Sequence, residues 1–221
     1  MLGISFEELS KSIPKSPQEA DDIMEKEWYR VNPQTEQEII DFYINNFVYL
    51  CVQLRKYGDK GPDFRNDQWF QYLENHIPSI RDMNILDYGC GSALHSVTLV
   101  NNGCKHVTIA DLPTRLFKIA QKMLQIPPVK TITITEKYPL MEKYDLIICT
   151  DVLEHVKDPH LVLGHLAEHT KYLYLSVTFG GAYAPYHLHE NAVKYCADWL
   201  NILKAYNLHQ IGEQLWEVWC D

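Results

Sequence analysis

A short segment that combines an acid with two glycines, Ile85-Leu86-Asp87-Tyr88-Gly89-Cys90-Gly91-Ser92-Ala93, carries the clearest chemical signal in the chain. A strand that ends in Gly-x-Gly before a helix lets a ligand approach the backbone closely, at the positive end of that helix. A dinucleotide-binding fingerprint would need its third glycine at position 94, where the sequence has leucine. Asp87 is unsuited to a pyrophosphate and attracts a cation. The segment therefore favours a ligand that carries positive charge.

Two later segments extend this signal in the expected order. Thr108-Ile109-Ala110-Asp111-Leu112 ends a predicted second strand in an acid, and Asp151-Val152-Leu153-Glu154-His155-Val156 follows a predicted fourth strand. With these segments the chain resembles the class I S-adenosylmethionine-dependent methyltransferases. Asp87-x-Gly89-x-Gly91-x-Ala93 is similar to motif I of that family, with Ala93 in place of the third glycine. The sequence Asp151 to Val156 is typical of branches that modify small molecules.

The resemblance implies a cofactor and the residues that bind it. The cofactor is S-adenosyl-L-methionine, which leaves as S-adenosyl-L-homocysteine, and its α-ammonium and sulfonium groups suit the carboxylate of Asp87. Asp111 is expected to bind the two ribose hydroxyls, and Thr135 with Glu136 to contact the adenine. The full expected cofactor-binding set is Asp87, Gly89, Cys90, Gly91, Asp111, Leu112, Thr135, Glu136, Thr150 and Asp151.

Three histidines are the candidate catalytic residues. Methyl transfer from a sulfonium is an in-line displacement, and a hydroxyl nucleophile also needs a general base. His155 follows the predicted fourth strand, beside the expected methyl position, while His187 and His189 lie in the loop after the fifth, where open α/β sheets bind ligands. The alternative is that His187 and His189 simply begin the next helix. No third ligand for a His-x-His metal site is near in sequence, so no metal is expected.

The elements that must position these residues alternate from Met83 onward. Strands are predicted over 84–88, 106–110, 131–135, 144–149 and 171–177, helices over 94–100, 114–124, 158–169 and 191–206, and a closing pair of strands over 210–213 and 215–220. Alternating βα units favour an α/β fold, with a parallel sheet covered by helices on both faces. The resemblance implies a Rossmann-like sheet of seven strands whose last strand is reversed.

The first 82 residues lack the alternating strand and helix pattern of the later sequence and are predicted to form helices. Ser16, Pro17 and Glu19 form a capping box with proline at the first helical position, which predicts a helix to about Arg30. A second capping box begins at Thr35, and the apolar spacing after it predicts one helix over 39–54. We expect residues 1–82 to form a helical cap on the methyltransferase domain of residues 83–221. The cap is either a scaffold or a lid that excludes water from the substrate; the aromatic residues that would close such a lid are Trp28, Tyr29, Tyr43 and Trp69.

The composition of the chain limits which classes of partner and which location we expect. The 221 residues carry a net charge of −9, which disfavours binding to nucleic acid. The six cysteines form no CxxC pair and match neither a zinc site nor a disulfide framework. The N-terminus is polar and acidic without the apolar run of a signal peptide, and no apolar run is long enough to cross a membrane. We expect a soluble protein of the cytoplasm.

The resulting hypothesis is a methyltransferase that acts on an oxygen or nitrogen of a small-molecule acceptor. One alternative within enzymes is methylation of a protein or an RNA. An alternative from another class is a methyltransferase-like binding protein without catalysis. The intact Asp87, Gly89, Gly91 and Asp111 disfavour that last alternative, because a scaffold requires no such ligand set.

Overall fold

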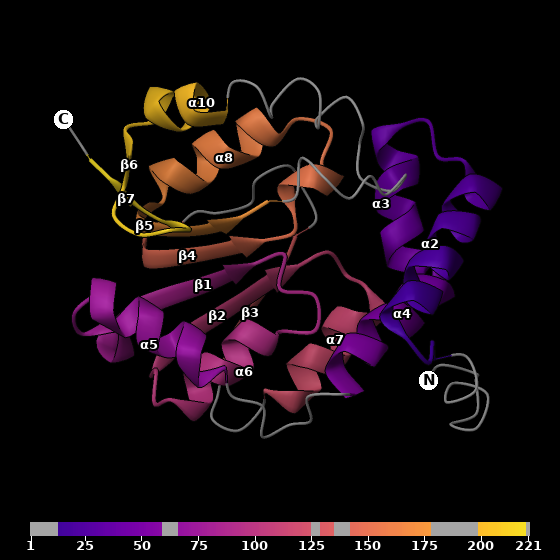
Figure 1. Cartoon of the computed structure of the whole chain (residues 1–221), viewed down its shortest axis with the longest axis horizontal. Helices are drawn as coiled ribbons and strands as arrows, with labels where there is room; N and C mark the ends of the chain where they lie inside the picture. The colour runs from indigo at the N-terminus through magenta and orange to yellow at the C-terminus, as the bar shows by residue number, and fades with distance from the viewer. Residues whose placement is uncertain (1–12, 59–65, 125–128, 135–141, 178–198, 220–221) are drawn as a thin grey trace.

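The computed structural model describes residues 13–58, 66–124, 129–134, 142–177 and 199–219. Within these residues one mixed sheet of seven strands forms the centre of the molecule, in the order β3-β2-β1-β4-β5-β7-β6 (Figure 1). The strands are β1 Asn84–Tyr88, β2 His106–Asp111, β3 Lys130–Thr133, β4 Tyr144–Thr150, β5 Thr170–Ser176, β6 Leu208–Gln210 and β7 Leu215–Val218.

The register of the sheet brings the predicted motifs to one edge. β1 pairs in parallel with both β2 and β4, so that Tyr88 lies between Ala110 and Cys149. The five parallel strands β1 to β5 all point toward the helices of the N-terminal region (Figure 1). β7 is antiparallel to its neighbours β5 and β6. The predicted α/β fold with a reversed last strand is confirmed.

Helices cover both faces of this sheet. On one face lie α5 (Asp67–His76), α6 (Leu94–Asn101) and α7 (Arg115–Met123), and on the other lie α8 (Pro159–Glu168) and α10 (Trp199–Ala205) (Figure 1). The two short 3-10 helices are η1 (Ile80–Asp82) and η2 (Leu153–His155).

Neighbouring residues of the central strands enter two different cores, as strand geometry requires. Leu86 and Ile147 belong to the cluster under α8, whereas Ile85 and Ile148 belong to the cluster under α5. All four side chains are fully buried. Burial on both faces explains why β4 has an unbroken apolar run from Leu146 to Cys149 rather than an alternating pattern.

The N-terminal helices α2 (Pro17–Val31), α3 (Glu36–Asn45) and α4 (Phe47–Gly58) pack together at the carboxyl edge of the sheet (Figure 1). Both predicted capping residues are present, because Ser16 accepts from the Glu19 backbone and Thr35 from that of Glu38. The single helix expected over 39–54 is wrong. Asn46 interrupts it.

Asn46 ends one helix and starts the next. Its backbone N–H donates to the carbonyl of Phe42, and its extended backbone then leaves the helical path. Its side-chain oxygen accepts the N–H of Tyr49 at 2.9 Å, which caps α4. Apolar spacing alone does not reveal the break, since the same helical period continues on both sides of it.

Smaller differences affect the ends of other elements. β3 ends at Thr133 rather than at residue 135, and the closing pair begins at Leu208 rather than at Gln210. The first part of the helix predicted over 191–206 lies outside the described residues, and its last part is α10. Among the helices that the structure describes, none has the length and apolar character needed to cross a membrane.

The close approach of the β1 and β4 ends predicts unequal effects of two glycine substitutions. A Cβ at Gly89 would lie 2.4 Å from Cγ2 of Val152, whereas a Cβ at Gly91 would meet only Leu116, at 3.8 Å. Both glycines have positive φ, so alanine is strained at either position. We expect Gly89→Ala to lower the free energy of unfolding by on the order of 3 kcal/mol, and Gly91→Ala by about 1–2 kcal/mol, in urea denaturation. The double variant Gly89→Ala/Val152→Ala should relieve the clash and recover part of the lost stability. Equal losses of unfolding free energy in Gly89→Ala and Gly91→Ala would contradict this packing.

Candidate active site

The glycine turn after β1 is fixed by hydrogen bonds to the end of β2. The N–H groups of Gly89 and Cys90 both donate to the carbonyl of Ala110, at 2.8 and 3.2 Å. The N–H of Gly91 donates to Oδ2 of Asp111 at 2.6 Å. Two of the motifs identified in the sequence therefore meet directly. The carboxylate at the end of β2 holds the backbone of the turn that follows β1.

This turn leaves open space at Gly91, where a ligand could contact the backbone of the protein. Gly91 has φ +53°, and the nearest atom to a Cβ placed there is 3.8 Å away. Ala93 takes the left-handed conformation too, with φ +58°, and its side chain is fully buried. This is the position where the family motif has its third glycine. Alanine meets the same backbone requirement at some conformational cost.

Asp111, which holds this turn from the end of β2, has a raised pKa. Its Oδ1 accepts the N–H of Leu112 at 2.7 Å, while Oδ2 accepts that of Gly91. Burial raises the pKa of the Asp111 carboxyl to about 6, against the lowering effect of these two hydrogen bonds. Nearby Asp87 adds to the rise. A carboxylate can accept about four hydrogen bonds, so the two backbone donors leave acceptor capacity for hydroxyl groups.

Asp87 has a structural partner that the sequence analysis missed. Its Oδ2 accepts both the Oγ–H of Ser96 at 2.6 Å and the Ser96 N–H at 3.2 Å. α6 begins after Ala93, which has no side chain able to cap it. The carboxylate from β1 therefore satisfies an N–H of the first turn of α6. Asp87 is 2% exposed, and its pKa is raised by burial while the charge of nearby His95 lowers it.

The end of β4 lies beside the same turn. Thr150 is the last residue of β4 and is half-buried, and Asp151 follows it with φ +53° and an exposed side chain. The N–H of Asp151 donates to the carbonyl of Ser176 at 3.0 Å, which ties this end to β5. Glu154 in η2 is 2% exposed, so this segment carries a buried acid that the sequence analysis did not single out.

His155 connects this segment to the N-terminal helices. A hydrogen bond of 2.9 Å joins its Nδ1 to the hydroxyl of Tyr43 in α3. The ring of Tyr43 in turn makes an edge contact with Tyr49 of α4, with centroids 5.1 Å apart. Burial, and then the charges of Asp111 and Cys90, raise the pKa of Tyr49. The phenol of Tyr49 therefore lies near the glycine turn, and two tyrosines of the N-terminal helices face the edge where the motifs meet.

The other aromatic residues expected in a lid have different surroundings. Trp28 is buried against Phe42 within the N-terminal helices. Tyr29 is 60% exposed. Trp69 lies under the sheet, where its ring packs against His95 and Tyr174. Of these aromatic residues, Tyr43 is the one for which the described part of the chain gives a hydrogen bond to an expected site residue.

Four of the expected site residues, Thr135, Glu136, His187 and His189, lie outside the described residues. Their assigned roles therefore stay predictions. Of the helix predicted over 191–206, which follows His187 and His189, only the part from residue 199 lies within the described residues, and it contains α10.

A cavity of about 580 Å³ lies among the N-terminal helices rather than at the strand ends. Glu27, Glu38 and Asp41 line it, together with Arg30. These groups already serve the local structure, because Glu27 pairs with Arg30, Glu38 completes the capping box of α3, and Asp41 accepts from a glutamine one turn earlier. We assign no ligand to this cavity.

A family model described as "Methyltransferase domain" matches residues 63–217, which is more than half of the chain. The chain belongs to this methyltransferase family. The resemblance to class I S-adenosylmethionine-dependent methyltransferases, drawn from the ordered motifs, is thereby confirmed at the level of family and fold.

Individual relatives cover shorter stretches. A ubiquinone biosynthesis O-methyltransferase of Idiomarina loihiensis is 27% identical over 107 residues, 45% of this chain and 43% of that protein. A tRNA U34 carboxymethyltransferase of Shewanella putrefaciens is 30% identical over 103 residues, 44% of this chain and 31% of that protein. The alignments thus span less than half the length of these curated relatives.

Among solved structures, magnesium protoporphyrin IX methyltransferase from Synechocystis PCC 6803, crystallised with bound S-adenosylmethionine, has a TM-score of 0.51. It is 18% identical, and the match covers 90% of this chain and 95% of that one. At this identity the likeness establishes the shared fold alone.

The residues present fit S-adenosylmethionine, the cofactor of the family. Asp111 keeps acceptor capacity for two ribose hydroxyls, and the open space at Gly91 lets a ligand approach the backbone. Asp87 is buried and accepts two hydrogen bonds from Ser96 at one oxygen, so its contact with the ammonium of a ligand stays a prediction. Leu112 directly follows Asp111, and Cys90 lies between Gly89 and Gly91.

The raised pKa of Asp111 predicts how cofactor affinity depends on pH. Below about pH 6 the carboxyl of the free protein binds a proton and loses part of its capacity to accept hydrogen bonds from a ribose. We expect the affinity for S-adenosylhomocysteine to be about tenfold lower at pH 5 than at pH 8 in titration calorimetry. Asp111→Asn is the matched control, with weak binding at both pH values. An affinity independent of pH in the unmodified protein would contradict this role of Asp111.

Proposed function

We propose that this protein is an S-adenosylmethionine-dependent methyltransferase whose acceptor is an oxygen or a nitrogen of a small molecule. The observation that carries the proposal is the junction of three motifs at the carboxyl edge of the sheet. At this edge Asp111 accepts the N–H of Gly91, and a second hydrogen bond joins Nδ1 of His155 to the hydroxyl of Tyr43. The first contact suits the cofactor and the second suits a covered acceptor.

On the cofactor side, the protein binds and orients. When bound, S-adenosylmethionine supplies a methyl group activated by a sulfonium. Asp111 would accept the ribose hydroxyls, and the backbone at Gly89 and Gly91 would leave room for the methionine portion. Thr150 and Asp151 at the end of β4 would line the pocket, and Thr135 with Glu136 would contact the adenine. Because in-line displacement depends on alignment, this rigid turn supplies much of the catalysis.

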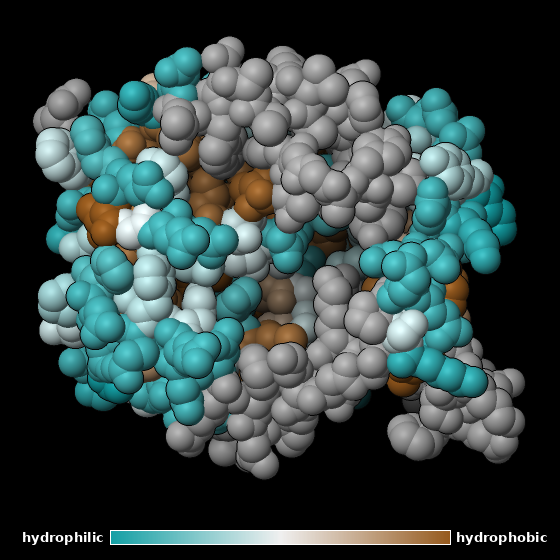
Figure 2. Space-filling view, viewed as in Figure 1, coloured by the Kyte–Doolittle hydropathy of each residue, from teal (hydrophilic) through white to brown (hydrophobic). Residues whose placement is uncertain are grey.

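On the acceptor side, His155 would orient the nucleophile or take its proton. Its hydrogen bond to Tyr43 fixes one ring nitrogen and therefore the direction of the ring. His187 and His189 remain candidates for contact with the same acceptor. Residues 1–82 would act as a lid over residues 83–221, since Tyr43 and Tyr49 bring the N-terminal helices to this edge. Figure 2 shows a recess in the surface between the sheet and these helices, which would leave space for a small acceptor.

A small acceptor is favoured over a macromolecule. The relatives named above include a ubiquinone biosynthesis O-methyltransferase, which supports an oxygen nucleophile. The match to a tRNA carboxymethyltransferase keeps an RNA acceptor as the second candidate. The net charge of −9 weighs against it, because phosphate backbones bind basic surfaces. A cytoplasmic location is part of the proposal.

An assay of methyl transfer tests the reaction itself. Purified protein with methyl-labelled S-adenosylmethionine would be offered phenols, carboxylates and amines in one set of reactions, and bulk RNA in another. We expect label in a small-molecule product and none in RNA. Label in RNA alone would favour the second candidate, and absence of cofactor binding in calorimetry would contradict the proposal altogether.

Removing one hydroxyl tests the role of the N-terminal helices. Tyr43→Phe keeps the ring but loses the hydrogen bond to His155, so we expect kcat/KM for the acceptor to fall roughly 3- to 10-fold. The affinity for S-adenosylhomocysteine should change less than twofold, because Asp111 and Gly91 are untouched. Tyr29→Phe, at an exposed tyrosine of α2, is the matched control and should behave as the unmodified protein. Unchanged kcat/KM in Tyr43→Phe would rule out this contact as a positioning device.

A further inference from the structure

Three side chains able to bind a metal ion gather at the C-terminal end of α8, away from the proposed active site. His165, Glu168 and His169 each offer one ligand atom, and these atoms all lie within 4.8 Å of one another. α8 ends at Glu168, and β5 begins at Thr170. The cluster therefore lies where β5 starts. The glycine turn follows β1 and His155 follows β4, so both lie at the opposite edge of the sheet, where the parallel strands end (Figure 1).

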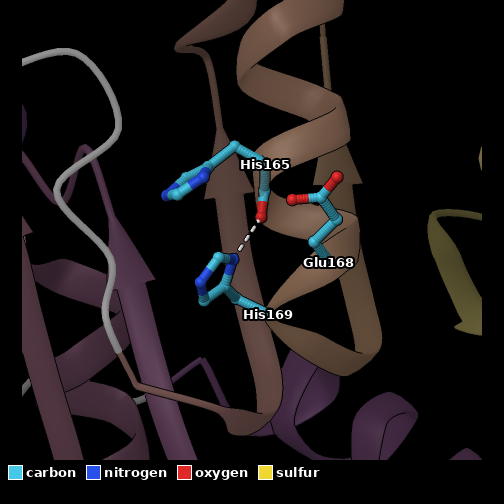
Figure 3. A group of neighbouring side chains, drawn as sticks. All are labelled: His165, Glu168 and His169. Atoms are coloured by element: carbon cyan, nitrogen blue, oxygen red, sulfur yellow. Dashed lines mark hydrogen bonds between the residues drawn. The ribbon is translucent and has the colours of Figure 1, made fainter.

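The ring of His169 is oriented by a hydrogen bond to the backbone of α8. Its Nδ1 lies 2.8 Å from the backbone carbonyl oxygen of His165 (Figure 3). A carbonyl oxygen only accepts, so Nδ1 carries a hydrogen, and in the neutral ring the lone pair is then on Nε2. Histidines that bind metals in proteins commonly donate their other ring N–H to a carbonyl or carboxylate in this way.

His165 stands one helical turn earlier, on the same side of α8. The two imidazole rings lie side by side, with centroids 4.4 Å apart and planes inclined by 44° (Figure 3). Histidines four residues apart on a helix are neighbours on its surface.

The local charges favour a cation over an anion. The last carbonyl groups of a helix carry a partial negative charge, and the carboxylate of Glu168 adds a full one. One cation opposes them, because Lys143 donates from Nζ to the backbone carbonyl of Glu168. That contact uses the carbonyl and not the carboxylate, so the ligand oxygens of Glu168 are not consumed by it.

We propose that His165, Glu168 and His169 bind a divalent transition-metal ion, with zinc as the best match to two imidazoles and one carboxylate. Water would complete a tetrahedral set. Ligand atoms around tetrahedral zinc are about 3.3 Å apart, so the 4.8 Å set must close slightly. Glu168 is exposed and can rotate to do so.

A metal ion at this place would stabilise the fold rather than take part in methyl transfer. The backbone N–H of Tyr144 donates to the carbonyl of His169 at 2.8 Å, so the last turn of α8 is already joined to the start of β4. An ion held by His165 and His169 would fasten the helix end to this junction. Because the ion binds only the folded state, the midpoint of thermal unfolding should rise with its concentration.

The test is a zinc titration of the full chain after treatment with a chelator, followed by calorimetry and by thermal unfolding. We expect one Zn²⁺ ion per chain with micromolar affinity, and a rise of a few degrees in the midpoint. Co²⁺ in place of Zn²⁺ should give the visible absorption of a tetrahedral site. The affinity for S-adenosylhomocysteine should stay the same with and without the metal.

Variants assign the binding to these residues. His165→Ala and His169→Ala should each lower zinc affinity at least tenfold, and Glu168→Gln should lower it several-fold while removing only the charge. His106→Ala, at an exposed histidine that starts β2, is the matched control and should bind zinc normally. Should a histidine variant unfold, Glu168→Gln decides the question, since its side chain is exposed and the replacement has nearly the same shape. Zinc bound equally by all variants, or by none including the unmodified protein, would overturn the proposal.

Discussion

The carboxylate of Asp111 and the backbone N–H of Gly91 form the contact on which the rest of the site depends, at 2.6 Å. It joins the turn after β1 to the end of β2. Without it, the positive-φ path from Gly89 to Ala93 would lack its principal side-chain anchor. The carbonyl of Ala110 provides the backbone part of the same junction. From the other side, Asp87 caps α6 through Ser96, so that two acids from neighbouring strands hold one loop and its helix.

This arrangement has a cost in stability, which the proposed role of Asp111 in binding the cofactor would explain. Burial raises the pKa of Asp111 to about 6 from an ordinary value of 3.8, so the folded state binds the proton more tightly than the unfolded chain does. The contribution of this group to stability therefore falls as the pH rises from about 4 to 6, and the cost persists at neutral pH. A hydroxyl-binding site needs the ionised carboxylate, because that form accepts the most hydrogen bonds.

Sequence reasoning succeeded where local patterns determine the structure, and its failures have physical causes. The glycine turn, the acid at the end of β2 and the reversed last strand follow from periodicity, spacing and the family resemblance. The break at Asn46 was missed, because a residue that ends one helix and caps the next leaves the apolar period intact. The pairs Tyr43–His155 and Asp87–Ser96 were missed as pairs, since the first joins residues 112 positions apart and the second depends on where α6 begins. Long-range contacts of this kind require the packed fold.

The central claim is that Asp111 and the glycine turn it holds form the ribose-binding part of a cofactor site. The most direct measurement is a crystal structure of the protein grown with S-adenosylhomocysteine. The account predicts ribose hydroxyls within hydrogen-bond distance of the Asp111 carboxylate, and the methionine portion beside Gly89 and Gly91. A ligand bound elsewhere, or a ribose that does not touch Asp111, would contradict it.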